Sequence, residues 1–191
     1  DDADSKAVKR GVLHCMENSG QSCNAPSRML VQRQVYDQAV ATATEVVGIV
    51  DVAAPQEKGR HIGPVVNEVQ FNKIQTLIEK GINEGARLVA GGLGRPDGMN
   101  RGFYVRPTIF ADVTNDMTIA QEEIFGPVLS ILPFDTEEEA VAIANDTVYG
   151  LTNYVQTQDS GRARRLARQL RSGMVETVSY THLTLPTIFR V

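Results

Sequence analysis

Residues 127–157 have the sequence PVLSILPFDTEEEAVAIANDTVYGLTNYVQT, and this stretch decides the fold class. Its first part, PVLSILPF, is a nearly continuous apolar run, which is typical of a buried strand. Thr136 and Glu139 then fit a capping box, in which two side chains satisfy free backbone amides at a helix start. We predict a helix from there to about Asn145 and a second strand at LTNYVQT. Strands joined by helices through short connections predict an α/β fold with a largely parallel sheet.

The same alternation of strand and helix patterns extends over the rest of the chain. Helices are predicted where apolar residues recur at helical spacing, namely at Val8, Gly11, Val12 and Cys15, at Tyr36, Val40, Ala43 and Val47, at Phe71, Ile74, Ile78 and Ile82, and at Ala163, Leu166, Ala167 and Leu170. Gly20 is suited to end the first of these helices, and Asp159 to cap the last. Further strands are predicted at residues 28–32 and 102–110, at 87–92, where the strand runs into a turn, and beginning at 174–178. In such parallel sheets, binding sites gather at the carboxyl ends of strands and at helix N-termini.

The composition excludes several classes of protein. With 42% hydrophobic and 22% charged residues and a net charge of -4, the chain resembles an ordinary soluble domain. No basic run is long enough to indicate nucleic-acid binding, and no apolar run approaches the roughly 18 residues that span a membrane. Two cysteines do not make a disulfide framework, so we expect a reducing compartment, the cytoplasm. No signal peptide is visible, and because Asp1 stands where Met is usual, we expect that the true N-terminus is missing.

The two cysteines differ in their surroundings. Cys15 falls on an apolar helical stripe, which predicts a small buried hydrophobic side chain. Cys23 lies in a polar turn between Gly20 and Pro26, where a thiol near backbone amides can act as a nucleophile. The residues alone leave two interpretations of Cys23 open, a nucleophile or an incidental thiol.

Partners for Cys23 are not evident in the sequence. None of the three histidines has a spacing that links it to Cys23, so a Cys–His hydrolase has no support; these are His14, His61 and His182. Two cysteines without a CxxC pattern or a histidine cluster also argue against zinc, and we expect no metal site.

Five blocks of the sequence resemble segments of the aldehyde dehydrogenase superfamily, in the family's order and approximate spacing. They are ENSGQSCNAPSR at 17–28, GPVVNEVQFNKI at 63–74, GFYVRPTIF at 102–110, QEEIFGPVLSILPF at 121–134 and AIANDTVYGLTNYVQT at 142–157. The first resembles the family's Gly-Gln-x-Cys turn, and the fourth its Glu-x-Phe-Gly-Pro cofactor motif. The likeness covers about residues 1–176. It implies an incomplete catalytic domain of the aldehyde dehydrogenase fold, an α/β unit with a parallel βαβ sheet.

The resemblance implies NAD(P)-dependent oxidation of an aldehyde to a carboxylic acid, with NAD or NADP as the cofactor. Cys23 is then the nucleophile, its thiolate forms a thiohemiacetal, and its backbone amide is one oxyanion donor. Hydride transfer leaves a thioester, which water activated by a glutamate hydrolyses. This chemistry agrees with the ready attack of sulfur on a carbonyl carbon and with the oxyanion's need for aimed donors.

The resemblance also assigns four residues to cofactor binding. Glu123 matches the glutamate that binds the nicotinamide ribose, and a carboxylate can accept hydrogen bonds from two hydroxyls at once. Phe125 matches the aromatic residue beside the nicotinamide ring, and Gln70 and Lys73 are expected near the adenosine half. Without the resemblance, the residue types favour a solvated Glu123 and a buried Phe125.

Two parts of the chain are expected, a partial catalytic domain at 1–176 and a non-native tail at 177–191. The family's cofactor domain, its glutamate base and an asparagine oxyanion donor would lie upstream of this sequence. The tail contains VSYTHLTLPT at 178–187, which resembles translated sequencing-adapter sequence. A divergent native strand is the alternative.

The expected function belongs to a longer parent protein. We predict that this chain alone is nearly inactive, because cooperating catalytic groups are not independently useful. The parent is expected to be a homo-oligomer that binds a small aldehyde. Two other functions remain open, namely cysteine-dependent ester hydrolysis or acyl transfer, and a non-enzymatic redox or binding module. The sequence chooses neither the aldehyde nor between NAD and NADP.

Overall fold

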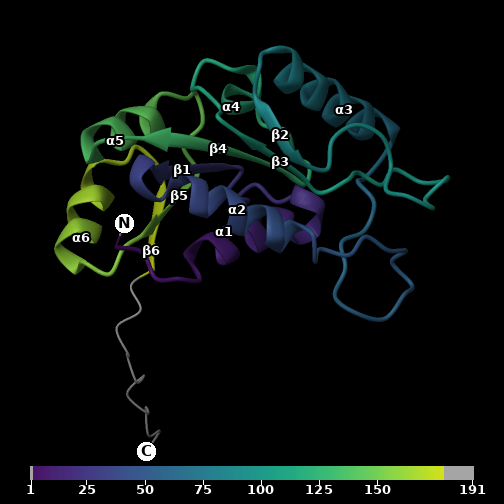
Figure 1. Ribbon diagram of the computed structural model, residues 1–191, viewed down its shortest axis with the longest axis horizontal. Coiled ribbons are helices and arrows are strands. Elements are labelled where there is room, and N and C mark those ends of the chain that lie inside the picture. The colour runs from purple at the N-terminus through teal and green to yellow at the C-terminus, as the bar shows by residue number, and fades with distance from the viewer. Residues whose placement is uncertain (1, 179–191) are drawn as a thin grey trace, which may run out of the picture.

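A four-stranded sheet forms the centre of the fold (Figure 1). The structure, a computed structural model, describes residues 2–178 of the 191-residue chain. The strand order is β1-β4-β3-β2, with β1 at Arg28–Gln32, β2 at Arg87–Ala90, β3 at Thr108–Ala111 and β4 at Val128–Phe134. β4 pairs in parallel with β1 and with β3, whereas β2 pairs antiparallel with β3. The predicted α/β class with a mostly parallel sheet is therefore confirmed.

Helices cover both faces of this sheet (Figure 1). One face carries α1 (Ala7–Met16) and α2 (Tyr36–Val47), and the other carries α3 (Glu68–Asn83) and α4 (Thr118–Gln121). Successive side chains of a strand point to opposite faces, so β3 and β4 supply both cores. The side chains that join the α1–α2 core are Ile109, Ala111, Leu129 and Ile131. Those that join the α3–α4 core are Phe110, Val128 and Leu132.

The apolar stripe predicted for α3 is wrong at its end. Ile82 is 39% exposed, whereas Gly81 is buried and packs closely against Ile119. The buried face therefore runs through Ile74, Ile78 and Gly81, and Ile82 lies about 100° further around the helix. The close contact at Gly81 thus decides which side of the last turn faces the sheet.

A separate two-stranded sheet follows the central one. It consists of β5 (Thr152–Gln156) and β6 (Met174–Val178), which are parallel and are connected by α6 (Ser160–Gln169). α5 (Glu137–Asn145) connects β4 to β5. The sequence predicted one sheet, and the structure has two, because β5 and β6 pair with each other and with no strand of the four-stranded sheet.

The predicted helix N-caps at Thr136 and Asp159 are confirmed. The backbone amide of Glu139 donates to Thr136 Oγ1 at 3.1 Å, and the Glu139 carboxylate accepts from the amide of Asp135 at 2.7 Å. Asp159 caps α6 by accepting hydrogen bonds from two backbone amides of its first turn. These signals act within a few residues, which is why the sequence alone locates them.

Two predicted segments end differently in the structure. The strand expected at 102–110 begins only at Thr108, because Pro107 has no amide hydrogen to donate to a ladder. At the other end of the chain, Thr177 and Val178 complete β6, and residues 179–191 of the expected tail lie outside the described residues.

Two short 3₁₀ segments flank β1, and the first of them precedes the cysteine. They are η1 (Glu17–Gly20), which follows α1, and η2 (Arg33–Val35), which links β1 to α2. Cys23 lies between η1 and β1. It therefore lies near the amino end of β1, an edge strand of the four-stranded sheet.

Candidate active site

Two loops meet at the amino ends of β1 and β4. The cysteine loop (residues 17–27) precedes β1, and the EIFGP segment (residues 123–127) precedes β4. Because β1 and β4 are parallel neighbours, their amino ends lie at the same end of the sheet. Both motifs come before their strands, so these residues do not lie at the carboxyl ends of β1 and β4.

The two loops touch at a pair of glycines. A Cβ atom added at Gly20 would lie 1.9 Å from the carbonyl oxygen of Gly126, so only glycine fits at this position. Asn18, Ser19 and Gly20 have φ angles of 51°, 57° and 69°, in the left-handed region that suits glycine and, to a lesser degree, asparagine. This run turns the chain out of the helix. α1 itself ends at Met16, so Gly20 ends η1 rather than α1, contrary to the prediction.

The cysteine loop is also tied to residues 63–66. Ser19 Oγ donates to the carbonyl oxygen of Gly63 at 2.7 Å, and Gln21 Oε1 accepts from the amide of Val66 at 2.8 Å. The other end of the Gln21 amide donates to the carbonyl oxygen of Asn18 at 3.0 Å. Three sequence blocks that are far apart along the chain therefore converge just before Cys23.

The two cysteines have opposite environments, as the sequence predicted. Cys15 is fully buried, and its Sγ donates to the carbonyl oxygen of Val128 at 3.6 Å. Burial raises the pKa of the Cys15 thiol to about 12. Cys23 is exposed and free of any disulfide. Its sulfur is therefore the one that a small molecule can reach.

Gln70 and Lys73 brace the EIFGP segment from α3. Gln70 Nε2 donates to the carbonyl oxygens of Ile124 and Phe125 at 2.8 and 2.9 Å. Lys73 Nζ donates to the carbonyl oxygen of Glu123 at 2.8 Å. The sequence had placed both side chains near a cofactor, but it gave no indication that they hold this backbone.

The Glu123 side chain is half-buried. Burial raises the pKa of its carboxyl group, and the charge of Lys73 offsets part of this effect. Among the side chains and amides of residues 2–178, the carboxylate accepts no hydrogen bond. A carboxylate that is partly withdrawn from water without a protein donor fits a ligand that brings hydroxyl donors, such as a ribose. This hydrogen-bond acceptor therefore suits the cofactor that the sequence implied.

Phe125 is half-buried and has a strained backbone. Its φ angle is 50°, which is uncommon for a bulky side chain and costs conformational energy. The Gln70 hydrogen bond to its carbonyl oxygen helps to hold this conformation. Phe125 is thus neither sealed in the core nor fully in solvent.

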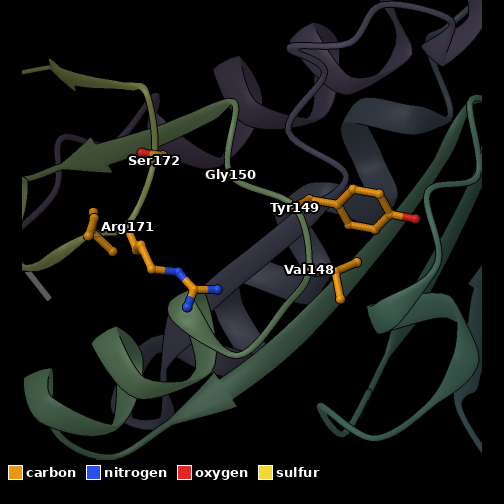
Figure 2. Close-up of a pocket in the computed structure, with 6 residues that line it drawn as sticks. Val148, Tyr149, Gly150, Arg171 and Ser172 are labelled. Carbon is orange, nitrogen blue, oxygen red and sulfur yellow. The ribbon is translucent and has the colours of Figure 1, made fainter.

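A surface pocket of ≈ 430 Å³ lies between the α5–β5 and α6–β6 connections (Figure 2). It is lined by Val148, Tyr149, Gly150, Leu170, Arg171 and Ser172. None of the five predicted site residues lines it, but Tyr149 connects it to them, because its hydroxyl oxygen accepts from the Glu123 amide at 3.2 Å. The sequence missed this link, although Tyr149 lies within one of the blocks that carry the resemblance.

Two further properties concern only the part of the chain that the structure describes. Within residues 2–178, no group of three or more His, Cys, Asp or Glu side chains is arranged to hold a metal ion. No helix there combines the length and apolar character that crossing a membrane requires.

Comparisons with known proteins agree with this geometry. A sequence model of the Aldehyde dehydrogenase family matches residues 1–189. Among curated proteins, 3-succinoylsemialdehyde-pyridine dehydrogenase from Pseudomonas sp is 49% identical over 176 residues, which are 92% of this chain and 37% of that protein. The chain therefore spans well under half the length of this relative.

Solved structures give the same result. An aldehyde dehydrogenase from Bartonella henselae matches with a TM-score of 0.91 and 61% identity, over 92% of this chain and 37% of that chain. Aldehyde dehydrogenase C from Pseudomonas syringae, a mutant in complex with NAD+ and octanal, matches with a TM-score of 0.91 and 48% identity, over 94% of this chain and 37% of that chain. Sequence and fold lead to one conclusion: the chain belongs to the aldehyde dehydrogenase family.

Proposed function

We propose that the complete protein is an NAD(P)-dependent aldehyde dehydrogenase and that this chain supplies its catalytic cysteine and part of its cofactor site. The observation that carries the proposal is the contact between Gly20 and Gly126, which brings the loop of the exposed Cys23 against the EIFGP segment. The relative from Pseudomonas syringae, in complex with NAD+ and octanal, supports the same substrate and cofactor classes here. Because the chain spans 37% of that relative, the activity is proposed for the complete protein.

Cys23 is the nucleophile of the proposed reaction. Its sulfur adds to the carbonyl carbon of an aldehyde and forms a thiohemiacetal, whose oxyanion the Cys23 backbone amide stabilises. When bound, the nicotinamide ring supplies the acceptor for the hydride that leaves this carbon. The thioester that remains on Cys23 is hydrolysed to a carboxylic acid, with water activated by a glutamate from outside this chain, and the thiol is restored.

The EIFGP segment positions the nicotinamide half of the cofactor. The Glu123 carboxylate would accept hydrogen bonds from the ribose hydroxyls, and the Phe125 ring would pack beside the nicotinamide. Gln70 and Lys73 serve this site by holding the segment's carbonyl oxygens. This role differs from a contact with the adenosine half, which is the one the resemblance implied.

The decisive experiment uses the complete open reading frame that contains this chain. The purified protein is assayed with a panel of aldehydes and with NAD and NADP, by following the absorbance of the reduced cofactor. We expect oxidation of at least one aldehyde, its loss in Cys23→Ala, and its retention in Cys15→Ala, which removes the buried thiol instead. Oxidation that survives in Cys23→Ala would overturn the mechanism. The 191-residue chain alone is expected to be nearly inactive.

A second candidate function rests on the exposure of Cys23. An accessible thiol can be acylated by an activated ester and then hydrolysed without any cofactor, so cysteine-dependent ester hydrolysis is the alternative. Ester hydrolysis by the complete protein, with no aldehyde oxidised under either cofactor, would favour it. Absence of both activities would favour a redox or binding module.

Three further assignments belong to the same proposal. The parent is a homo-oligomer, and it works in the cytoplasm, where the two free cysteines remain reduced. Residues 177–191 are a non-native tail attached to a partial catalytic domain at 1–176. Sequencing of the gene across the codon of Glu176 tests the last assignment, because native codons beyond it would refute an adapter origin.

A further inference from the structure

A second tether holds the cysteine loop on the other side of Cys23 in sequence. The hydroxyl of Tyr154, on β5, donates to the carbonyl oxygen of Asn24 at 2.9 Å. Asn24 directly follows Cys23, whereas the contacts of Ser19, Gly20 and Gln21 all precede it. The exposed cysteine therefore lies between two anchored points of the backbone.

Tyr154 is itself held in place. Its half-buried ring meets the ring of His14 edge-on, with centroids 5.1 Å apart and an interplanar angle of 75°. His14 lies in the last turn of α1, from which the chain leads into the cysteine loop. The backbone of Tyr154 is fixed by the pairing of β5 with β6, opposite Glu176. Its hydroxyl therefore has a defined position relative to both ends of the loop.

The Asn24 carbonyl belongs to the turn that presents the thiol. The amide of Ala25 donates to the carbonyl oxygen of Ser22 at 3.0 Å, so Cys23 and Asn24 are the two central residues of this turn. A hydrogen bond to the Asn24 carbonyl restricts the peptide plane next to the nucleophile. Such restriction matters, because a misplacement of about 1 Å in a reacting group can cost about 100-fold in rate.

We propose that Tyr154 is a positioning residue for Cys23, which acts through the carbonyl group of Asn24 and fixes the turn that carries the sulfur. The inference rests on the proposed function, since it concerns the nucleophile of that reaction. Tyr154 touches neither the reacting atoms nor the cofactor in this role. The two-stranded sheet thereby contributes to catalysis, although none of the predicted site residues lies on it.

The test replaces Tyr154 by Phe in the complete protein, which removes the hydroxyl and keeps the ring against His14. Tyr36→Phe is the matched control, because the Tyr36 hydroxyl also donates to a backbone carbonyl, that of Ile131 at 3.1 Å, within the core. We expect Tyr154→Phe to lower kcat about tenfold with the KM for the cofactor unchanged, and to speed hydrogen exchange at the Ala25 amide. Tyr36→Phe is expected to lower the melting temperature without either change.

Each outcome bears on the tether. A kcat within about twofold of wild type in folded Tyr154→Phe, or an unchanged exchange rate at Ala25, would overturn the proposal. An equal loss of kcat in Tyr36→Phe would show a general structural effect and would overturn it too. If the wild-type protein oxidises no aldehyde, the proposed function fails, and the exchange rate at Ala25 still decides whether Tyr154 holds the turn.

Discussion

Cys15 and Cys23 are close in sequence but lie in regions of opposite character. Cys15 points from α1 into the core against β4, where no solvent reaches it. Cys23 comes after the left-handed run at 18–20, which takes the chain off the core and places the thiol in the open. The comparison teaches that a short change of backbone conformation, rather than the residue type, separates a structural thiol from an accessible one.

The largest expected difference between the two regions is in alkylation. At pH 8, the pKa of about 12 for Cys15 leaves a thiolate fraction on the order of 10⁻⁴, and its burial blocks access as well. We expect iodoacetamide to label Cys23 at least about 1,000-fold faster than Cys15, as measured by peptide mass spectrometry.

The pH dependence of the same reaction sharpens the comparison. Because burial raises the pKa of Cys15, its protonated form persists in the folded state up to about pH 12, and its labelling should rise with pH over the whole accessible range. Comparable labelling of both cysteines in the folded protein at pH 8 would contradict the burial of Cys15.

A second prediction concerns the glycine that makes the turn. In Gly20→Ala, the new Cβ meets the carbonyl oxygen of Gly126 and the positive φ is strained. We therefore expect the free energy of unfolding to fall by about 3 kcal/mol or more. Gly85→Ala is the control, since Gly85 also has a positive φ but nothing lies within 4 Å of its Cβ position. The free energy of unfolding of Gly85→Ala should fall by only about 1 kcal/mol. Urea denaturation measures both, and equal losses would mean that the two loops do not touch.

A third prediction compares the same substitution at the two cysteines. Cys15→Ser places a hydroxyl in the core and should lower the free energy of unfolding by about 2 kcal/mol. Cys23→Ser changes an exposed side chain and should alter it by about 0.5 kcal/mol or less. The difference is measured by urea denaturation of the two variants side by side. A Cys23→Ser variant as unstable as Cys15→Ser would place Cys23 in a packed environment.

The smallest predicted effect concerns the braces of the EIFGP segment. Gln70→Leu removes two hydrogen bonds from a half-buried side chain and should lower the free energy of unfolding by about 1 kcal/mol. Lys73→Met removes one hydrogen bond from an exposed side chain and should lower the free energy of unfolding by about 0.5 kcal/mol. Thermal unfolding of both variants gives the order, and a larger loss for Lys73→Met would reverse the assigned importance of the two braces.

Local signals in the sequence predicted much of the fold. The strand at 28–32 was predicted with its observed bounds, and so were the caps at Thr136 and Asp159. The burial of Cys15 also followed from helical spacing. These predictions succeeded because hydrophobic period and capping act over a few neighbouring residues.

Other features depended on how the elements pack. Periodicity placed Ile82 on the buried face of α3, but Gly81 packs against Ile119 there instead. The strand pattern of 127–157 indicated one sheet, and it could not show that β4 has partners on both edges. The hydrogen bonds that hold the backbone of Glu123 and Phe125 could not be predicted from the sequence either, because they join side chains of α3 to a loop elsewhere in the chain.

The amino-acid sequence by itself determined the α/β elements, the family to which the chain is similar and the identity of Cys23 as the candidate nucleophile. Only the tertiary structure decided that Gly20 lies against Gly126, that Gln70 and Lys73 hold the EIFGP segment, and that Tyr154 reaches Asn24. The physical reason is one of range. Caps and periodic patterns form between neighbours in the chain. The candidate site, in contrast, forms because β1 and β4 pair in parallel and bring their preceding loops to the same end of the sheet.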